Sequence, residues 1–113
     1  MKSYFRYVRG NHGKGLGAVM VNEYPHGEFK IGVSICNPND EFSKTEARRV
    51  AEENLEKSDI YNFFEIIDGD WAVEVVEFLP HRDKIVDDVL SVIWDIADDI
   101  MADYARSHYE SIA

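Results

Sequence analysis

The sequence predicts an α+β protein with a three- or four-stranded antiparallel sheet, a middle helix and a long acidic C-terminal helix. Three β-rich segments near the N-terminus, separated by short glycine-containing breaks, predict the sheet. A capping signal followed by helical periodicity predicts the middle helix. A long stretch of helical period fills the last third of the chain. At 113 residues, we expect one domain over residues 1–113.

The first third of the chain has strand character. Residues 2–9 alternate aromatic or aliphatic with basic or polar residues, which suits a half-buried pleated surface. Residues 16–24 and 29–36 are also β-rich. The breaks at 10–15 and 25–28 contain glycine, and the second adds a proline. Three strands joined by short turns predict an antiparallel meander.

The middle of the chain carries a helix-start signal. Ser43 is followed three residues later by Glu46, which is the capping-box spacing, so a helix should begin at about Ser43. Its apolar face is predicted to consist of Ala47, Val50, Ala51 and Leu55. This helix can lie across the sheet.

The next segments are less clearly patterned. The apolar run in 58–69 is too short to separate strand from helix by period, and we favour a short helix. Residues 70–80 are rich in β-branched and aromatic residues and end at Pro80, which predicts a fourth strand at a sheet edge. Trp71 in that strand is expected to be a core or interface anchor.

A long helix is predicted from Asp83 to about His108, where apolar residues recur at intervals of three and four. Such a helix would measure about 36 Å, more than a domain of this size needs. Packing on the sheet and pairing in a helical dimer both fit the apolar seam. We expect the chain to form a homodimer or a higher oligomer.

The outer face of this helix is acidic. Seven aspartates and one lysine lie between Asp83 and Asp103. Aspartate is a poorer helix former than glutamate, and like charges one turn apart destabilise a helix, which favours selection of these residues for an interaction. A face that only contacts solvent explains the same residues. Trp94 lies beside this face and should be more exposed than Trp71. The predicted partner-binding residues are Asp87, Asp88, Asp95, Asp98, Asp99 and Asp103.

The overall charge restricts the class of partner. The net charge is −10 and the sequence pI is near 4.7. The protein therefore repels phosphate backbones and anionic lipids, so we expect neither direct nucleic-acid binding nor membrane binding. The sign favours a basic protein instead, including one that itself grips nucleic acid. A single cysteine and the absence of a signal-like or membrane-length apolar stretch predict a cytoplasmic protein.

No catalytic or metal-binding motif is recognisable. The four histidines lie far apart without the HExxH spacing, and the aspartates lack the calcium-loop pattern. Cys36 as a nucleophile has no sequence support beyond its presence. We therefore expect no enzyme activity, no cofactor and no metal, with no catalytic residue to name.

A second candidate site is basic. The glycine-rich break at 10–15 contains Lys14 and could form a backbone nest for an anion, although it lacks the P-loop spacing. Lys44 and Arg48 stand near the start of the middle helix, where backbone donors also collect. A hairpin turn and ordinary ion pairs explain the same residues. The possible anionic-ligand residues are therefore Lys14, Lys44 and Arg48.

The order of these pieces resembles a group of small, largely uncharacterised bacteriophage-encoded proteins. These typically show a strand ending in Ser-x-Cys-x-x-x-Asp-x-Phe-x-Lys, then a helix, then a long helix that follows a proline. The resemblance covers about half the chain. The matching positions are Ser34, Cys36, Asp40, Phe42, Lys44, Arg48, Ala51, Pro80 and Tyr104.

The chain also departs from this group. Ala47 stands where a glycine is usual, a basic residue usual near Asn54 is missing, and residues 57–77 look like an insertion. The missing basic residue would weaken an anionic-ligand site. The resemblance implies an inhibitor of host defence, because small acidic viral proteins without catalytic motifs frequently block a nucleic-acid-binding protein or sequester a nucleotide signal.

Three functional hypotheses follow. The first is a non-enzymatic inhibitor of the anti-CRISPR or DNA-mimic type, acting in the host cytoplasm, whose acidic helix binds a basic surface of a host nucleic-acid-binding defence protein. The second is a module that captures a nucleotide signal between subunits through Lys14, Lys44 and Arg48. The third is an oligomeric scaffold built on the long helix.

Overall fold

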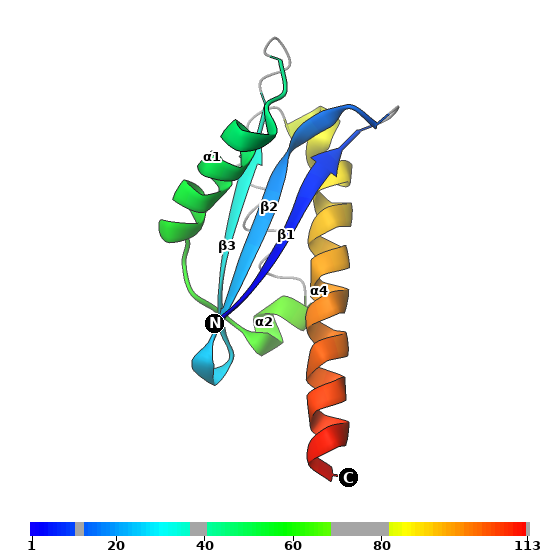
Figure 1. The fold of residues 1–113 in the computed structure, drawn as a ribbon. Coiled ribbons are helices and arrows are strands. Elements are labelled where there is room, and N and C mark those ends of the chain that lie inside the picture. Colours follow the sequence, from blue (N-terminus) through cyan, green and yellow to red (C-terminus); the bar gives the residue numbers. More distant parts are fainter. Residues whose placement is uncertain (11–12, 37–40, 69–81, 113) are drawn as a thin grey trace.

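The structure is a computed structural model that describes residues 1–10, 13–36, 41–68 and 82–112 (Figure 1). It has an α+β fold in which three of the strands come first and the longest helix comes last. The elements in chain order are β1 (Lys2–Arg9), β2 (Gly15–Tyr24), the 3-10 turn η2 (Pro25–Gly27), β3 (Glu28–Ile35), α1 (Lys44–Glu56), β4 (Tyr61–Asn62), α2 (Phe63–Asp68) and α4 (Arg82–Ile112).

The four strands form one antiparallel sheet in the order β1-β2-β3-β4. Phe5 pairs with Met20 across β1 and β2, and Val19 pairs with Val33 across β2 and β3. The predicted three-strand meander is therefore confirmed, with strand bounds within one residue of those expected. Tight hairpin turns enforce this order, because each strand can pair at once with its sequence neighbour.

A fourth strand, β4, lies within a segment for which a short helix was predicted. β4 consists of Tyr61 and Asn62, which pair with Phe29 and Glu28 of β3. The short helix predicted within 58–69 is confirmed only for α2, and the helical prediction is wrong for residues 61–62. Tyr61 is buried in the core beside the sheet, which favours extended pairing at that point. The strand predicted at 70–80, with Trp71, lies outside the described residues.

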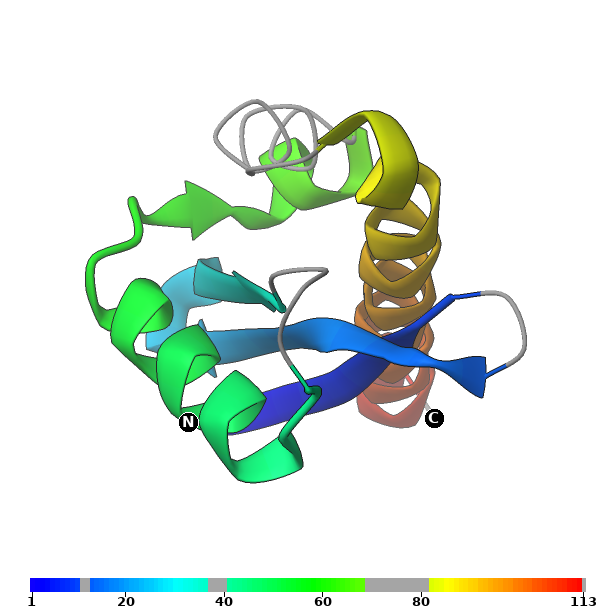
Figure 2. The same cartoon turned by 90° about the horizontal axis from the view of Figure 1, so that it is seen from above.

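The sheet lies between two helices. Figure 2 shows α1 on one face and α4 on the other. Alternation along the strands supplies both faces, because successive side chains point in opposite directions. Val19 and Val21 of β2 pack with the α4 side of the core, whereas Ala18 and Met20 pack with the α1 side.

Helix α1 begins as predicted. Ser43 is its N-cap, and the Ser43 Oγ accepts a hydrogen bond from the backbone N–H of Glu46 at 3.3 Å. Ala47, Ala51 and Leu55 form its buried face. The helix approaches the sheet closely at Gly32, where a Cβ atom would lie 2.0 Å from the carbonyl oxygen of Ala51. Glycine at this position is therefore required by space.

Helix α4 is slightly longer than predicted. Its 31 residues begin at Arg82 and end at Ile112, which corresponds to about 46 Å of helix. Its sheet-facing residues are buried, namely Val89, Ile93, Ile96, Ala97 and Ile100, so packing on the sheet is confirmed. The C-terminal end extends past the sheet, as expected from its length (Figure 1). Pairing with another subunit remains a prediction.

Membrane-spanning character is not found in the described helices, none of which is both long and apolar enough to cross a bilayer.

Candidate protein-interaction surface on helix α4

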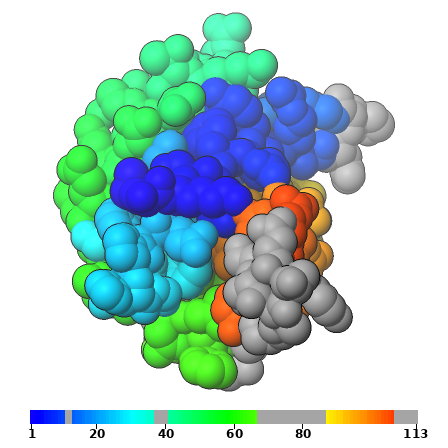
Figure 3. Space-filling view, turned by 60° about the horizontal axis from the view of Figure 1, so that its bottom comes forward, coloured from blue at the N-terminus to red at the C-terminus, as the bar shows by residue number. Residues whose placement is uncertain are grey.

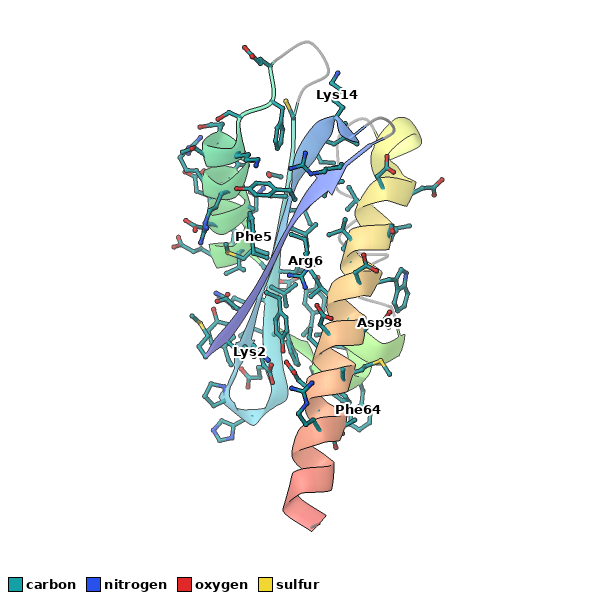
Figure 4. The ribbon with its side chains drawn as sticks, turned by 45° about the vertical axis from the view of Figure 1, so that its right-hand side comes forward. Lys2, Phe5, Arg6, Lys14, Phe64 and Asp98 are labelled. Carbon is teal, nitrogen blue, oxygen red and sulfur yellow. The ribbon has the colours of Figure 1, made fainter. Side chains whose placement is uncertain are left out.

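Strand β1 presents a polar row to helix α4. Side-chain alternation places Lys2, Tyr4 and Arg6 on the α4 side, while Phe5 points to α1. Figure 4 shows Arg6 between β1 and α4 and Phe5 on the opposite side of the strand. Because β1 is an edge strand of the sheet, its long cationic side chains can reach the flank of the helix.

Two of the predicted aspartates are paired with this row. Arg6 forms an ion pair with Asp99, and Lys2 forms one with Asp103. The hydroxyl group of Tyr4 lies 3.1 Å from Asp103 Oδ2. We call Asp99 and Asp103 the paired aspartates. They fasten α4 to β1.

The Tyr4 hydroxyl group is held in its neutral form. It lies 3.1 Å from Glu23 Oε2 as well as 3.1 Å from Asp103 Oδ2. Burial raises the pKa of Tyr4 to about 12, and the negative charge of Glu23 adds to this shift. A single phenol proton thus lies between two carboxylates at the junction of β1, β2 and α4.

The other aspartates face outward. Asp87, Asp95 and Asp98 are exposed and Asp88 is half-buried. None of the four forms a hydrogen bond or ion pair with another described side chain. We call Asp87, Asp95 and Asp98 the open aspartates, because they are both exposed and without such a partner. Their charge is available to a partner molecule.

Large apolar side chains lie beside the open aspartates. Trp94 is 43% exposed, Met101 is 45% exposed and Tyr104 is 57% exposed. Phe64 of α2 is 72% exposed and joins this set through Phe63, whose ring centroid lies 4.6 Å from that of Tyr104 and 6.2 Å from that of Phe64. We call Trp94, Met101, Tyr104 and Phe64 the apolar strip. Trp94 is exposed, but its expected comparison with Trp71 falls on a residue outside the described ones.

A capping box fixes the position of α2. The backbone N–H of Glu65 donates to Asn62 Oδ1 at 2.9 Å, and the backbone N–H of Asn62 donates to Glu65 Oε2 at 2.7 Å. This reciprocal pair closes the first turn of the helix and sets Phe63 and Phe64 beside α4. The Asn-x-x-Glu spacing, which the prediction from periodicity did not use, is a sequence signal that could have located this helix start.

The basic residues of the second candidate site have different surroundings. Lys44 Nζ lies 5.5 Å from the ring centroid of Tyr7, and Arg48 lies 5.1 Å from that of Phe5, so both cap aromatic rings of β1. Arg48 also pairs with Glu52 at 3.3 Å. Lys14 is exposed in the β1–β2 turn at one end of the sheet (Figure 4).

The start of α1 borders a cleft of about 380 Å³. Its lining includes Ser34, Cys36 and Phe42, three of the residues that carry the resemblance. The carboxylates of Glu41 and Glu46 also line it, so its electrostatic character disfavours an anion. The pKa of Glu46 is lowered by its hydrogen bonds from Arg49, which keeps this carboxylate charged.

A second cleft, of about 460 Å³, lies at the other end of the sheet. Phe29, Phe63 and Ile100 line it with apolar surface, and Lys2 and Asp103 lie among its charged residues. Figure 3 shows the surrounding segments meeting there: the start of β1 in dark blue, the β2–β3 turn in light blue, α2 in green and α4 in orange. Opposite charges are balanced at this cleft, unlike on the outer face of α4.

Metal coordination has no support in the part of the chain that the structure describes, where no group of three or more His, Cys, Asp or Glu side chains could hold an ion. Comparison of the chain with protein-family models, curated proteins and solved structures finds no match.

Proposed function

We propose that the protein is a non-enzymatic inhibitor whose helix α4 binds a basic surface of a host nucleic-acid-binding defence protein. The observation that carries the proposal is the row of open aspartates. Three exposed carboxylates without a described partner stand on one rigid helix, and their mutual repulsion opposes folding. A basic partner would turn this repulsion into attraction.

The arrangement suits a mimic of nucleic acid. Carboxylates at fixed spacing on a helix can occupy the lysines and arginines that otherwise contact phosphates. The packing of α4 on the sheet holds these groups in place before binding, which reduces the entropy that association costs. We place this interaction in the host cytoplasm, in line with the resemblance to bacteriophage proteins.

The test is affinity capture from bacterial lysate, after nuclease treatment, with the wild-type protein and with Asp95→Asn/Asp98→Asn. We expect the wild type to retain a protein whose binding to DNA or RNA it then blocks in a gel-shift assay. The variant should retain much less of it. Glu56→Gln/Asp59→Asn is the matched control, because it removes two exposed acidic charges elsewhere.

The result that contradicts the proposal is equally concrete. Equal capture by the wild type and by Asp95→Asn/Asp98→Asn at low salt would exclude the open aspartates as the binding surface. Capture of a protein whose nucleic-acid binding is unchanged in the presence of this chain would exclude the inhibitory mechanism.

The nucleotide-binding hypothesis has less geometric support. Lys44 and Arg48 already contact aromatic rings, and Arg48 also contacts Glu52. A thermal-shift screen with cyclic and linear nucleotides tests it, because a ligand that binds only the folded state raises the melting temperature. The scaffold hypothesis is favoured by one feature, the end of α4 that extends past the sheet (Figure 1), and light scattering tests it.

A further inference from the structure

The apolar strip is concentrated on one side of the molecule. Six large hydrophobic side chains are exposed in the described residues, and four of them form this strip. The other two are Met1 and Ile60. Trp94 and Met101 are seven residues apart, so they lie two turns apart on the same side of α4, at a separation of about 10 Å. A grouped exposure of this kind is typical of an interaction site.

The strip and the open aspartates are adjacent. Asp98 follows Trp94 by four residues and precedes Met101 by three, and residues at both spacings are neighbours on a helix surface. The open aspartates therefore line one flank of the strip. Tryptophan and methionine are enriched at interface cores, where their burial contributes much of the binding energy.

We propose that the apolar strip and the open aspartates form one docking surface for a cationic amphipathic helix of the partner protein. The apolar ridge of that helix packs on Trp94 and Met101, and its lysines or arginines lie over Asp95 and Asp98. This inference rests on the proposed function, which requires only that the partner has a basic surface. It adds that this surface of the partner is a helix and that the helix has an apolar face.

The geometry favours a helix as the occupant. From Trp94 to Tyr104 the strip follows α4 for about 15 Å. A second helix laid along it offers apolar residues at i, i+3, i+4 and i+7 over a matching length. Basic residues on the adjacent face of that helix then reach the open aspartates. A flat surface with scattered lysines would not contact the apolar strip and the open aspartates together.

Charge disfavours a second copy of this chain at the same position. Two copies packed strip to strip would bring two sets of open aspartates to the edges of one interface. Like charges in such an arrangement cost association energy, whereas opposite charges accelerate association. Any homodimer would accordingly use another face of the molecule.

The experiment uses three synthetic peptides as probes. The first is a peptide of leucine and lysine arranged with helical period. The second is its scrambled isomer, which has the same charge and no apolar face. The third replaces lysine by glutamate. Binding is followed by the fluorescence anisotropy of a dye on the peptide, at low and at high salt.

We expect the amphipathic cationic peptide to bind at both salt concentrations, the scrambled isomer to bind only at low salt, and the glutamate peptide not to bind. Trp94→Ala and Met101→Ala should each lower the affinity for the amphipathic cationic peptide by about 10-fold. Ile60→Ala is the matched control, since Ile60 is 60% exposed and lies outside the strip. Its affinity should equal that of the wild type.

Several results would overturn the inference. Equal binding of the scrambled and amphipathic peptides, with no effect of Trp94→Ala, would show that the strip is not used and would leave the proposed function standing. Binding of the glutamate peptide would remove the requirement for a cationic helix. A dimer that Trp94→Ala dissociates would identify a second copy as the occupant. Unchanged thermal unfolding of each variant establishes that lost affinity is not lost folding.

Discussion

The paired and the open aspartates of α4 have the same chemistry and different surroundings. Asp99 and Asp103 form ion pairs with Arg6 and Lys2 of β1, whereas Asp95 and Asp98 are exposed to solvent. The two groups are separated by less than half a turn around the helix. A carboxylate on this helix is therefore structural or available according to whether β1 reaches it, and the helical pattern alone does not distinguish the two cases.

The difference also explains how a strongly acidic helix remains on the sheet. The cations of β1 offset the negative charge on the flank of α4 nearest the sheet. Buried isoleucines on the opposite side of α4 pack on the sheet and hold the helix in place. The repulsion that remains is confined to the outer flank. This is the place where charge can serve recognition without being required for folding.

The largest effect on stability is expected in the core, on the buried side of α4 opposite the two groups of aspartates. Ile96 is fully buried between α4 and the sheet, so Ile96→Ala should lower the free energy of unfolding by about 2–5 kcal/mol, through lost burial and the cavity that remains. Urea denaturation measures this. Ile60→Ala, at an exposed position, should change it by about 0.5 kcal/mol or less. Equal effects would contradict the packing of α4 on the sheet.

The comparison itself predicts the next effect. Asp103→Ala should lower the free energy of unfolding by about 1–2 kcal/mol relative to Asp95→Ala, since it removes the contacts with Lys2 and Tyr4. Both substitutions gain the same helix propensity, so their difference isolates the contacts. A double-mutant cycle with Lys2→Ala measures the share of the ion pair. Identical unfolding curves would show that the pairing contributes nothing.

Tyr4 gives a pH-dependent form of the same comparison. Its pKa is raised from 10.0 to about 12 in the folded protein by burial and by Glu23. Between these values the unfolded chain loses the phenol proton while the folded protein keeps it, so stability falls as pH rises. Tyr4→Phe removes this contribution. Urea midpoints of the variant should therefore decline less steeply across this range than those of the wild type.

The smallest effect is expected at the open aspartates. Asp95 repels Asp98 and Asp99 across one turn, so Asp95→Asn should raise the free energy of unfolding by about 0.2–0.5 kcal/mol at low salt. The gain should disappear at high salt, where these exposed charges are screened. A loss of stability at low salt would show that Asp95 has a structural partner.

Much of the fold followed from local patterns. The aromatic alternation of residues 2–9 and the Ser43 cap each identify an element through interactions between near neighbours in sequence. The start of α2 carried such a signal in Asn62 and Glu65, although the apolar run around it was ambiguous. The two-residue strand β4 carried none, because it forms only where β3 offers an edge.

The candidate site was predictable only in part. The helical period places all six aspartates on one outer arc, which contains both groups. Their division depends on Lys2, which lies 101 residues from Asp103 in sequence, and on Arg6, which lies 93 residues from Asp99. Only the tertiary placement of β1 beside α4 reveals it. Phe64 likewise belongs to the apolar strip only through a tertiary contact, because its neighbour Phe63 on α2 packs against Tyr104 on α4.

The most direct test of the account is the association rate of the cationic amphipathic peptide with the wild type, with Asp95→Asn/Asp98→Asn and with Glu56→Gln/Asp59→Asn. At low salt the association rate should fall several-fold for Asp95→Asn/Asp98→Asn and stay close to the wild-type value for Glu56→Gln/Asp59→Asn. At high salt the three association rates should become equal, because exposed charges are screened. Equal slowing by the two double variants would show that net charge, and not the open aspartates, attracts the peptide, which would contradict the central claim.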